Sequence, residues 1–276
     1  MNKGSGRLAV ITAVIFTGLA GAACAEPLET TVALSVNALS GQHQVGNGEA
    51  DRLSFAPLPL AELTLRHGTE SVRFEGLPPL TVGYFNQNFP GGSSTRLSIL
   101  NATYRHALRG GWFAGIGETV YNQDTSFGAR PNLFFERGSF FEAVDGSLRQ
   151  YSRVVGLRIE AGQRVNVGRN SIEYFAALNP RMHGIASTRV PTFGFACPPG
   201  AQTLAACSQL IDTFADGETA AQVDLTARIA QRVSKHGEIL YGLRYLNFTA
   251  RYDDFPGQLA DRNVGFAPSL GYRLKF

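Results

Sequence analysis

The sequence predicts an all-β fold, a closed antiparallel up-and-down transmembrane β-barrel of about ten strands, with eight or twelve strands as the alternatives. Three observations predict it. The N-terminus has the composition of a secretory signal, several later segments alternate between apolar and polar residues, and the final strand ends on an aromatic residue. Long and short connecting segments also alternate along the chain, and this alternation sets the expected strand number.

The N-terminal residues have the three parts of a Sec-type signal peptide. Lys3 and Arg7 form a short basic lead, residues 8–19 are almost continuously apolar, and Ala23-Cys24-Ala25 offers small residues before Glu26. The apolar stretch of roughly a dozen residues is shorter than the about 20 that a membrane-spanning helix needs. The pattern therefore predicts a cleaved signal rather than an anchor helix.

We expect cleavage after Ala25, which gives a signal peptide over residues 1–25 and one mature domain over residues 26–276. A lipoprotein with an acylated Cys24 is the alternative, but Gly21 occupies the position where such signals usually carry Leu, so Cys24 is expected to leave with the signal. The mature sequence contains no apolar run of helix-spanning length. Any membrane insertion must therefore use strands, because lipid offers no partners to unpaired backbone groups.

The composition favours a lipid-facing β protein. Charged residues make up 17%, below the roughly 25% of ordinary globular domains. Aromatic residues reach 11% and glycines number 31, which favours strands over helices. The net charge of +3 is small and scattered, so no nucleic-acid partner is expected. The chain has no phosphate-binding glycine loop, metalloprotease motif or dinucleotide fingerprint, so we expect no cofactor.

Period-two alternation marks the strands, with apolar residues expected toward lipid and polar ones toward the lumen. In the clearest segment, residues 221–229, Leu225 and Ile229 alternate with Asp224 and Arg228. Weaker examples are residues 30–38, 155–161 and 239–246. Each indicates one wall strand with a single lipid-facing side.

Connecting segments order these strands. Tight turns are expected at residues 67–70, 108–111, 162–169 and 234–237. Longer polar stretches are expected to be loops at residues 41–51, 86–94, 124–149, 184–217 and 253–262. Because periplasmic turns are short and extracellular loops long in bacterial barrels, the alternation gives about ten strands with both ends in the periplasm. Pro78-Pro79 predicts a bulge.

Three further local features are expected. Residues 132–144 are expected to form a small hairpin around Arg137-Gly138, and residues 203–214 have the apolar spacing of a short helix. The aromatic residues near strand ends are expected in interfacial girdles: Tyr84, Phe85, Trp112, Phe113, Tyr245, Tyr252 and Tyr272. The glycines of Gly115-Ile116-Gly117 are expected to leave room for bulky neighbours in the lumen.

The C-terminal strand carries a resemblance to a known class. Tyr272, Leu274 and Phe276 alternate with Arg273 and Lys275, and the sequence stops on Phe. This resembles the last strand of Gram-negative outer-membrane β-barrel proteins, whose terminal Phe is read by the barrel assembly machinery. The resemblance covers the whole mature chain. It implies an outer-membrane location, lipid as a partner, and contact with the assembly machinery during biogenesis.

Two cysteines remain after signal removal, Cys197 and Cys207. They lie in one expected extracellular loop in an oxidising compartment, which favours a disulfide. Such a short closure would stabilise by roughly 2–3 kcal/mol. Metal binding is the alternative, but no other residue with ligand spacing accompanies them.

A charge network is expected inside the barrel, because charges in a narrow lumen must pair. Its predicted members are Arg73, Glu75, Arg158, Glu160, Glu173, Asp224 and Arg228. Further candidates are Glu62, Arg66, Arg105 and Arg244. The network could form a structural plug or line a conduit for small solutes, and the strand number favours the plug.

The sequence therefore favours a binding or structural surface protein with a largely filled lumen and functional extracellular loops. A narrow porin-like channel is one alternative and an outer-membrane protease or lipase another. The omptin proteases share only size and strand count with this chain. Rim candidates for chemistry are His183 with Asp216, Asp253 and Asp254, but their spacing does not bring them together, so no catalytic residue is predicted. The ligand is not readable from the sequence.

Overall fold

The computed structural model describes residues 27–45, 51–54, 58–84, 93–127, 134–136, 139–141, 148–196, 199, 208–252 and 260–276. Nearly all of these residues are in strands. The strands are β1 (Glu29–Asn37), β2 (Ser40–Val45), β3 (Asp51–Ser54), β4 (Leu58–His67), β5 (Glu70–Tyr84), β6 (Ser93–Ala107), β7 (Trp112–Phe127), β8 (Phe134–Glu136), β9 (Ser139–Phe141), β10 (Leu148–Val167), β11 (Asn170–Ala196), β12 (Ser208–Arg232), β13 (Gly237–Tyr252) and β14 (Ala260–Lys275). A short 3-10 turn, η1 (Arg109–Gly111), joins β6 to β7. None of the helical segments in this part of the chain has the length and apolarity of a membrane-spanning helix.

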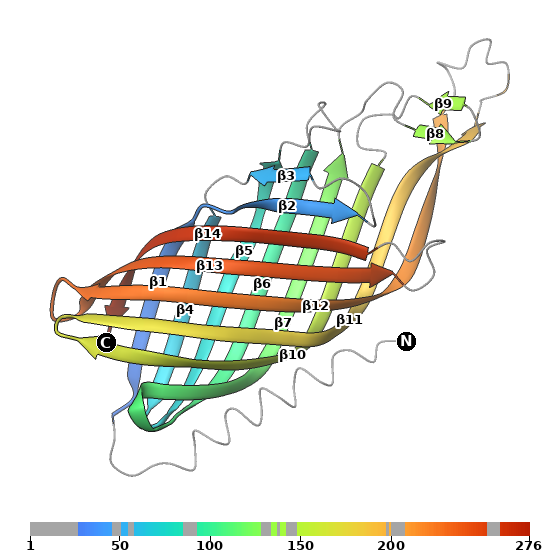
Figure 1. The fold of residues 1–276 in the computed structure, drawn as a ribbon. Coiled ribbons are helices and arrows are strands. Elements are labelled where there is room, and N and C mark those ends of the chain that lie inside the picture. The colour runs from blue at the N-terminus through green and yellow to red at the C-terminus, as the bar shows by residue number, and fades with distance from the viewer. Residues whose placement is uncertain are drawn as a thin grey trace.

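The described strands close into an antiparallel barrel (Figure 1). The wall runs β1-β4-β5-β6-β7-β10-β11-β12-β13-β14, and pairing of β1 with β14 closes it, which confirms the predicted ten strands. β2 continues β1 along the upper part of β14, and β3 pairs with β2 alone. These two strands form a hairpin at the barrel rim and add no wall strand.

Tight turns join the strands at the end of the barrel where the chain terminates (Figure 1). Gly68 and Gly168 have positive φ of 58° and 59°, which favours glycine at these corners. The predicted turn over residues 162–169 is too long, because residues 162–167 belong to β10. The side chains there still alternate, and the glycine at position 162 concealed the continuing strand.

The largest correction concerns the long extracellular stretches. β11 continues to Ala196 and β12 begins at Ser208, so the predicted loop over residues 184–217 is wrong for most of its length. The helix expected over residues 203–214 is wrong from residue 208 onward. Beyond the lipid both faces of a strand are wet, and side-chain alternation disappears while the backbone still pairs. The structure does confirm the small hairpin, in which β8 pairs with β9.

The upper parts of β11 and β12 form a ribbon that leaves the barrel. β10 pairs with β11 only as far as Arg149 opposite Arg189. Beyond that point residues 190–196 of β11 pair with β12 alone. We call residues 190–196 and 208–212 the ribbon; Figure 1 shows it rising above the rest of the wall.

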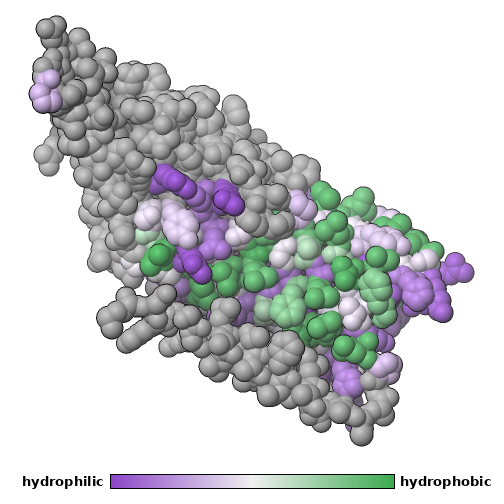
Figure 2. Space-filling model, turned by 180° about the vertical axis from the view of Figure 1, so that it is seen from behind, coloured by the Kyte–Doolittle hydropathy of each residue, from purple (hydrophilic) through white to green (hydrophobic). Residues whose placement is uncertain are grey.

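The outer face of the wall is an apolar belt, visible as green residues in Figure 2. Its large side chains are exposed, as the alternation predicts: Leu34 is 60% exposed, Leu225 is 44% and Leu243 is 52%. Exposure of this kind is stable only against lipid. The bulge predicted at Pro78-Pro79 is present as a register shift between Leu77 and Leu80.

Candidate functional site in the barrel lumen

The lumen is filled at mid-height by an ionic layer built from inward-facing strand positions. Its side chains come from eight different wall strands, so no single strand could place them. The structure brings all seven predicted network residues into this layer, with Glu62, Arg105 and Arg244 beside them. The layer also includes Arg164, Glu238, Arg273 and Lys275.

Asp224 of β12 occupies the centre of one half of the layer. Its side chain is fully buried and accepts two hydrogen bonds from Arg244, Nε to Oδ1 at 2.9 Å and Nη2 to Oδ2 at 2.6 Å. Arg158 donates to Oδ2 at 2.9 Å, and Arg244 also lies 2.8 Å from Glu75. Two guanidinium groups thus compensate one buried carboxylate, while each also contacts a second acid.

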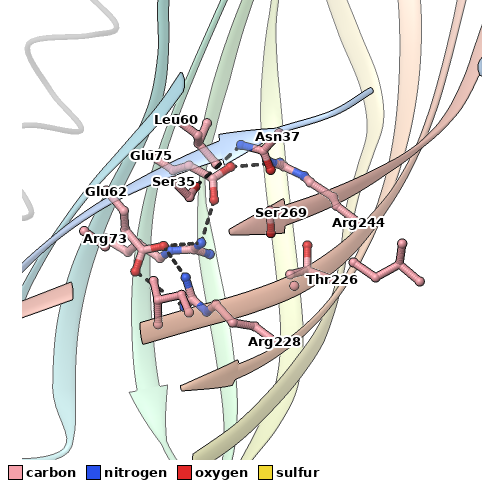
Figure 3. A pocket seen from close by; sticks show the side chains of 14 residues that line it. Ser35, Asn37, Leu60, Glu62, Arg73, Glu75, Thr226, Arg228, Arg244 and Ser269 are labelled. Carbon is pink, nitrogen blue, oxygen red and sulfur yellow. Dashed lines mark hydrogen bonds and ion pairs between the residues drawn. The ribbon is translucent and has the colours of Figure 1, made fainter. Parts of the chain in front are cut away.

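Glu62 of β4 holds the second cluster (Figure 3). Its Oε2 accepts hydrogen bonds from Arg73 at 2.7 Å and from Arg228 at 2.8 Å. Arg273 lies 3.7 Å from the other carboxylate oxygen. Arg73 also donates to Glu75 at 2.5 Å, which links this cluster to that of Asp224.

Glu173 of β11 holds the third cluster, nearest the tight turns. Its carboxylate accepts hydrogen bonds from Arg164 at 2.7 Å, Arg228 at 3.2 Å and Arg105 at 3.3 Å. Arg105 forms a further ion pair with Glu160. The sequence prediction missed Arg164, because its segment was assigned to a turn.

Arg66 was a candidate for the network but does not join it. Its side chain is exposed, and its Nε donates to the carbonyl oxygen of Gly68 at 3.1 Å within the adjoining turn. Arg273 was noted only as part of the C-terminal alternation, although its side chain is buried and ion-paired. The inward parity of β14 was the signal that would have placed it.

Uncharged polar side chains extend the hydrogen bonding toward the wall of β7 and β11. Thr119 donates to Asn101 at 2.7 Å, Asn179 donates to Thr119 at 3.0 Å, and Asn101 donates to Glu75 at 3.0 Å. Asn179 also donates to the carbonyl oxygen of Leu157 at 3.0 Å. The sequence prediction missed this chain because it considered charged residues alone.

An apolar layer fills the lumen above the ionic layer. Tyr121 and Phe248 stack with ring centroids 4.3 Å apart and an interplanar angle of 20°. Leu77, Val154 and Met182 pack into the same cluster, and the last two are fully buried. Sequence alternation did not reveal this layer, because apolar residues facing inward break the expected polar pattern.

One predicted girdle residue lies inside the barrel instead. Phe113 is buried, with its ring 6.4 Å from that of Phe175 and 4.5 Å from the Arg105 guanidinium carbon. Its inward parity and the cation–π contact explain the difference. Trp112, the preceding residue, faces outward with 48% exposure at the turn end of the belt, as a girdle residue would.

Described residues line two cavities in the lumen. One lies within the ionic layer, among Glu62, Arg73 and Arg244, and its volume is about 30 Å³ (Figure 3). This is room for about two water molecules. The second lies at the turn end and has a volume of about 600 Å³. We call it the vestibule.

Of the other predicted site residues, the structure describes His183 in full and only the backbone of Asp216. His183 is exposed on the outer wall, between Val155 and Thr219 of the neighbouring strands. Cys197, Cys207, Asp253 and Asp254 lie outside the described residues, as do the rings of Phe85 and Tyr252. The backbone of Asp216 is in β12, but its side chain lies outside the described part.

The C-terminal segment lies in the wall as its alternation predicts. Tyr272 and Leu274 face outward with 43% and 41% exposure, and Phe276 is 73% exposed. The amide of Phe276 donates to the carbonyl oxygen of Thr30 at 2.9 Å, which anchors the chain end to β1. Recognition of these residues by the assembly machinery stays a prediction.

Solved structures share the barrel. The outer-membrane protease OmpT from Escherichia coli matches with a TM-score of 0.58 and 10% identity, over 90% of this chain and 97% of that chain. The β domain of the Bordetella autotransporter BrkA has a TM-score of 0.43 and 14% identity, over 91% and 100% of the two chains. The Yersinia pestis protein Ail has a TM-score of 0.33 and 12% identity, over 89% and 98%. No family model and no curated sequence matches this chain.

The closed wall and the apolar belt define the class, and the fold shared with OmpT agrees with it. The chain is a Gram-negative outer-membrane β-barrel protein, and its location is the cell outer membrane. Its neighbours differ in function, so the shared fold assigns none to this chain.

Proposed function

We propose that this protein is a non-conducting surface protein that binds its partner through the parts that rise above the membrane. The observation that carries the proposal is the filled lumen. An ionic layer and an apolar layer lie one above the other, and the cavity within the ionic layer holds about 30 Å³. Hydrated ions need a continuous aqueous passage, which such packing does not offer.

The ribbon and the β8–β9 hairpin support the binding half of the proposal. From Ile185, an exposed residue of the apolar belt, β11 runs eleven residues further to Ala196. At about 3.3 Å per residue this is roughly 35 Å along the strand. The last seven of these residues, 190–196, belong to the ribbon, whose backbone extends beyond the pairing with β10 and so reaches further from the membrane than the rest of the wall.

Conductance in planar bilayers tests the filled lumen. The purified mature protein should give no steady steps. A Tyr121→Ala/Phe248→Ala/Met182→Ala variant, in which the apolar layer is emptied, should remain silent as well, because the ionic layer still closes the lumen. Steady ion-sized steps from the wild-type protein would replace the proposal with a narrow channel.

Adhesion of cells tests the binding role. Cells that display the wild-type protein should attach to an array of immobilised matrix proteins and glycans. A variant in which residues 190–212 are replaced by an Asn-Gly turn should lose that attachment while still folding into the barrel. Equal attachment by both strains to every surface would contradict binding through the ribbon.

The predicted rim histidine, His183, does not favour the hydrolase alternative. His183 faces outward from the wall, and no carboxylate contact to it is present among the described side chains. A lone exposed histidine lacks the oriented neighbours that nucleophilic or general-base chemistry needs. Equal protease and lipase readings from the wild type and from His183→Ala are expected, at the level of the buffer.

A further inference from the structure

The vestibule at the turn end of the barrel has the size of a ligand site and is lined mainly by cations. Its volume of about 600 Å³ lies within the range of small-molecule pockets. Seven Arg and Lys side chains line it, against the three carboxylates Glu29, Glu62 and Glu173. Such a wall of one charge sign concentrates small ions of the other sign.

The carboxylates that lie behind the vestibule lining do not cancel its excess of positive charge. Glu160 pairs with Arg105, and Glu238 pairs with Arg273 and Lys275. Even with these two acids included, seven bases meet five carboxylates around the vestibule. By contrast, the inner half of the ionic layer has little excess charge. There Glu75 and Asp224, with Glu160 shared between Arg158 and Arg105 of the vestibule, face Arg73, Arg158 and Arg244.

Buried donors without acceptors lie at the same place. Arg105, Arg228 and Arg273 line the vestibule, and their Nε–H groups, which are themselves buried in the wall, have no hydrogen-bond acceptor among the described residues. Arg273 is only 3% exposed and Arg105 is 8% exposed, so bulk water does not bathe these groups. Buried polar groups in folded proteins nearly always have partners. The unbalanced charge indicates an anionic ligand, and the unmet donors show that the neighbouring carboxylates do not use all the hydrogen-bonding capacity of these guanidinium groups.

Geometry narrows the ligand class. Arg228 reaches the vestibule from β12, Arg273 from β14 and Arg105 from β6, so guanidinium groups converge from separate parts of the wall. Each guanidinium offers a planar fork of donors that matches phosphate oxygens. An excess of two positive charges suits a ligand with at least two negative ones. The ionic layer forms the roof, so the ligand enters and leaves on the turn side.

We propose that the vestibule binds a small solute carrying two or more phosphate groups, taken up from the periplasmic side. This site is separate from the ribbon, and it does not depend on whether the lumen conducts. Two exposed residues at the mouth, Arg66 and Arg232, add charge without holding the ionic layer together. They are therefore the positions to change in a test that leaves the fold intact.

Isothermal titration of the mature protein in an uncharged detergent at low ionic strength tests the site. Inorganic pyrophosphate is the probe and citrate the carboxylate comparison. We expect saturable binding of one pyrophosphate per barrel. The Arg66→Gln/Arg232→Gln variant should bind it at least about tenfold more weakly, because two charge-assisted contacts are lost.

A matched control carries the same change of net charge elsewhere. Arg153 and Arg251 are exposed on the outer wall, away from the vestibule. The Arg153→Gln/Arg251→Gln variant should keep wild-type affinity within about twofold. Absence of saturable pyrophosphate heat, an equal loss in both double variants, or binding of citrate in preference to pyrophosphate would each overturn the proposal. Heat-modifiable mobility on gels confirms that every variant is folded.

Discussion

Removal of the Asp224 carboxylate should be among the most destabilising single changes in the barrel. Asp224→Ala leaves Arg158 and Arg244 buried, with their shared acceptor gone. Breaking a buried ion pair by deleting one partner costs about 3–5 kcal/mol. Both guanidinium groups keep a second acid, Glu160 for Arg158 and Glu75 for Arg244, so we expect the free energy of unfolding to fall by about 3 kcal/mol.

Urea unfolding from lipid vesicles measures this loss. The chain has one tryptophan, Trp112, which faces lipid at the turn end and reports the folded barrel through its fluorescence. A second variant, Asp224→Ala/Arg244→Met, removes one of the two stranded cations and should recover at least half of the lost free energy of unfolding.

The control is Arg153→Ala on the exposed outer wall, which should change the free energy of unfolding by no more than about 0.5 kcal/mol. A loss below about 1 kcal/mol for Asp224→Ala, comparable with that of an exposed pair, would refute the argument. The lumen would then be wet enough to solvate both arginines.

Three other outcomes follow from the structure. Gly117→Ala should destabilise the barrel in the same urea assay, because its Cβ would overlap backbone atoms of β6, whereas Gly76→Ala, with its nearest neighbour atom 3.6 Å away, should unfold like the wild type. The hydrogen bond and ion pair from the arginine at position 149 hold the pKa of the Asp124 carboxyl, above the apolar belt, below its usual value. Its contribution of up to about 1 kcal/mol should be complete above about pH 4 and fade as pH falls through the lowered pKa, and Asp124→Asn should flatten that part of the stability curve. Mass spectrometry of non-reduced peptides should find Cys197 joined to Cys207, and two free thiols in mature protein from an oxidising periplasm would contradict the disulfide.

The sequence predicted the wall well because lipid enforces a strict rule. Within the belt each strand has one apolar, lipid-facing side, so the alternation at residues 221–229 identified both the outward Leu225 and the inward Asp224. The same rule gave the strand number, since each missed strand would have reversed the order of long and short connections. The bulge at Pro78-Pro79 followed from the missing backbone donor.

Apolar–polar alternation fails as a guide where a strand does not have lipid on one face and a polar lumen on the other. Above the membrane neither face of β11 or β12 meets lipid, so their extensions were mistaken for a loop and a helix. Inside the lumen, packing rather than polarity decides, and Met182 and Phe248 face inward although they are apolar. Which carboxylate meets which guanidinium depends on how strands distant in the sequence are staggered, and a single sequence does not contain that information.

The ionic layer has a consequence for how the barrel is put together. Side chains change face with every residue along a strand, so a slip of one position between β12 and β13 would turn Asp224 or Arg244 out into hydrocarbon. Several carboxylates are each shared by arginines from different strands, so an error at one seam would disturb the charges at others. The ionic layer thus favours the native register during insertion. Only the barrel with the correct strand register can close without exposing a charged side chain to the hydrocarbon core of the membrane.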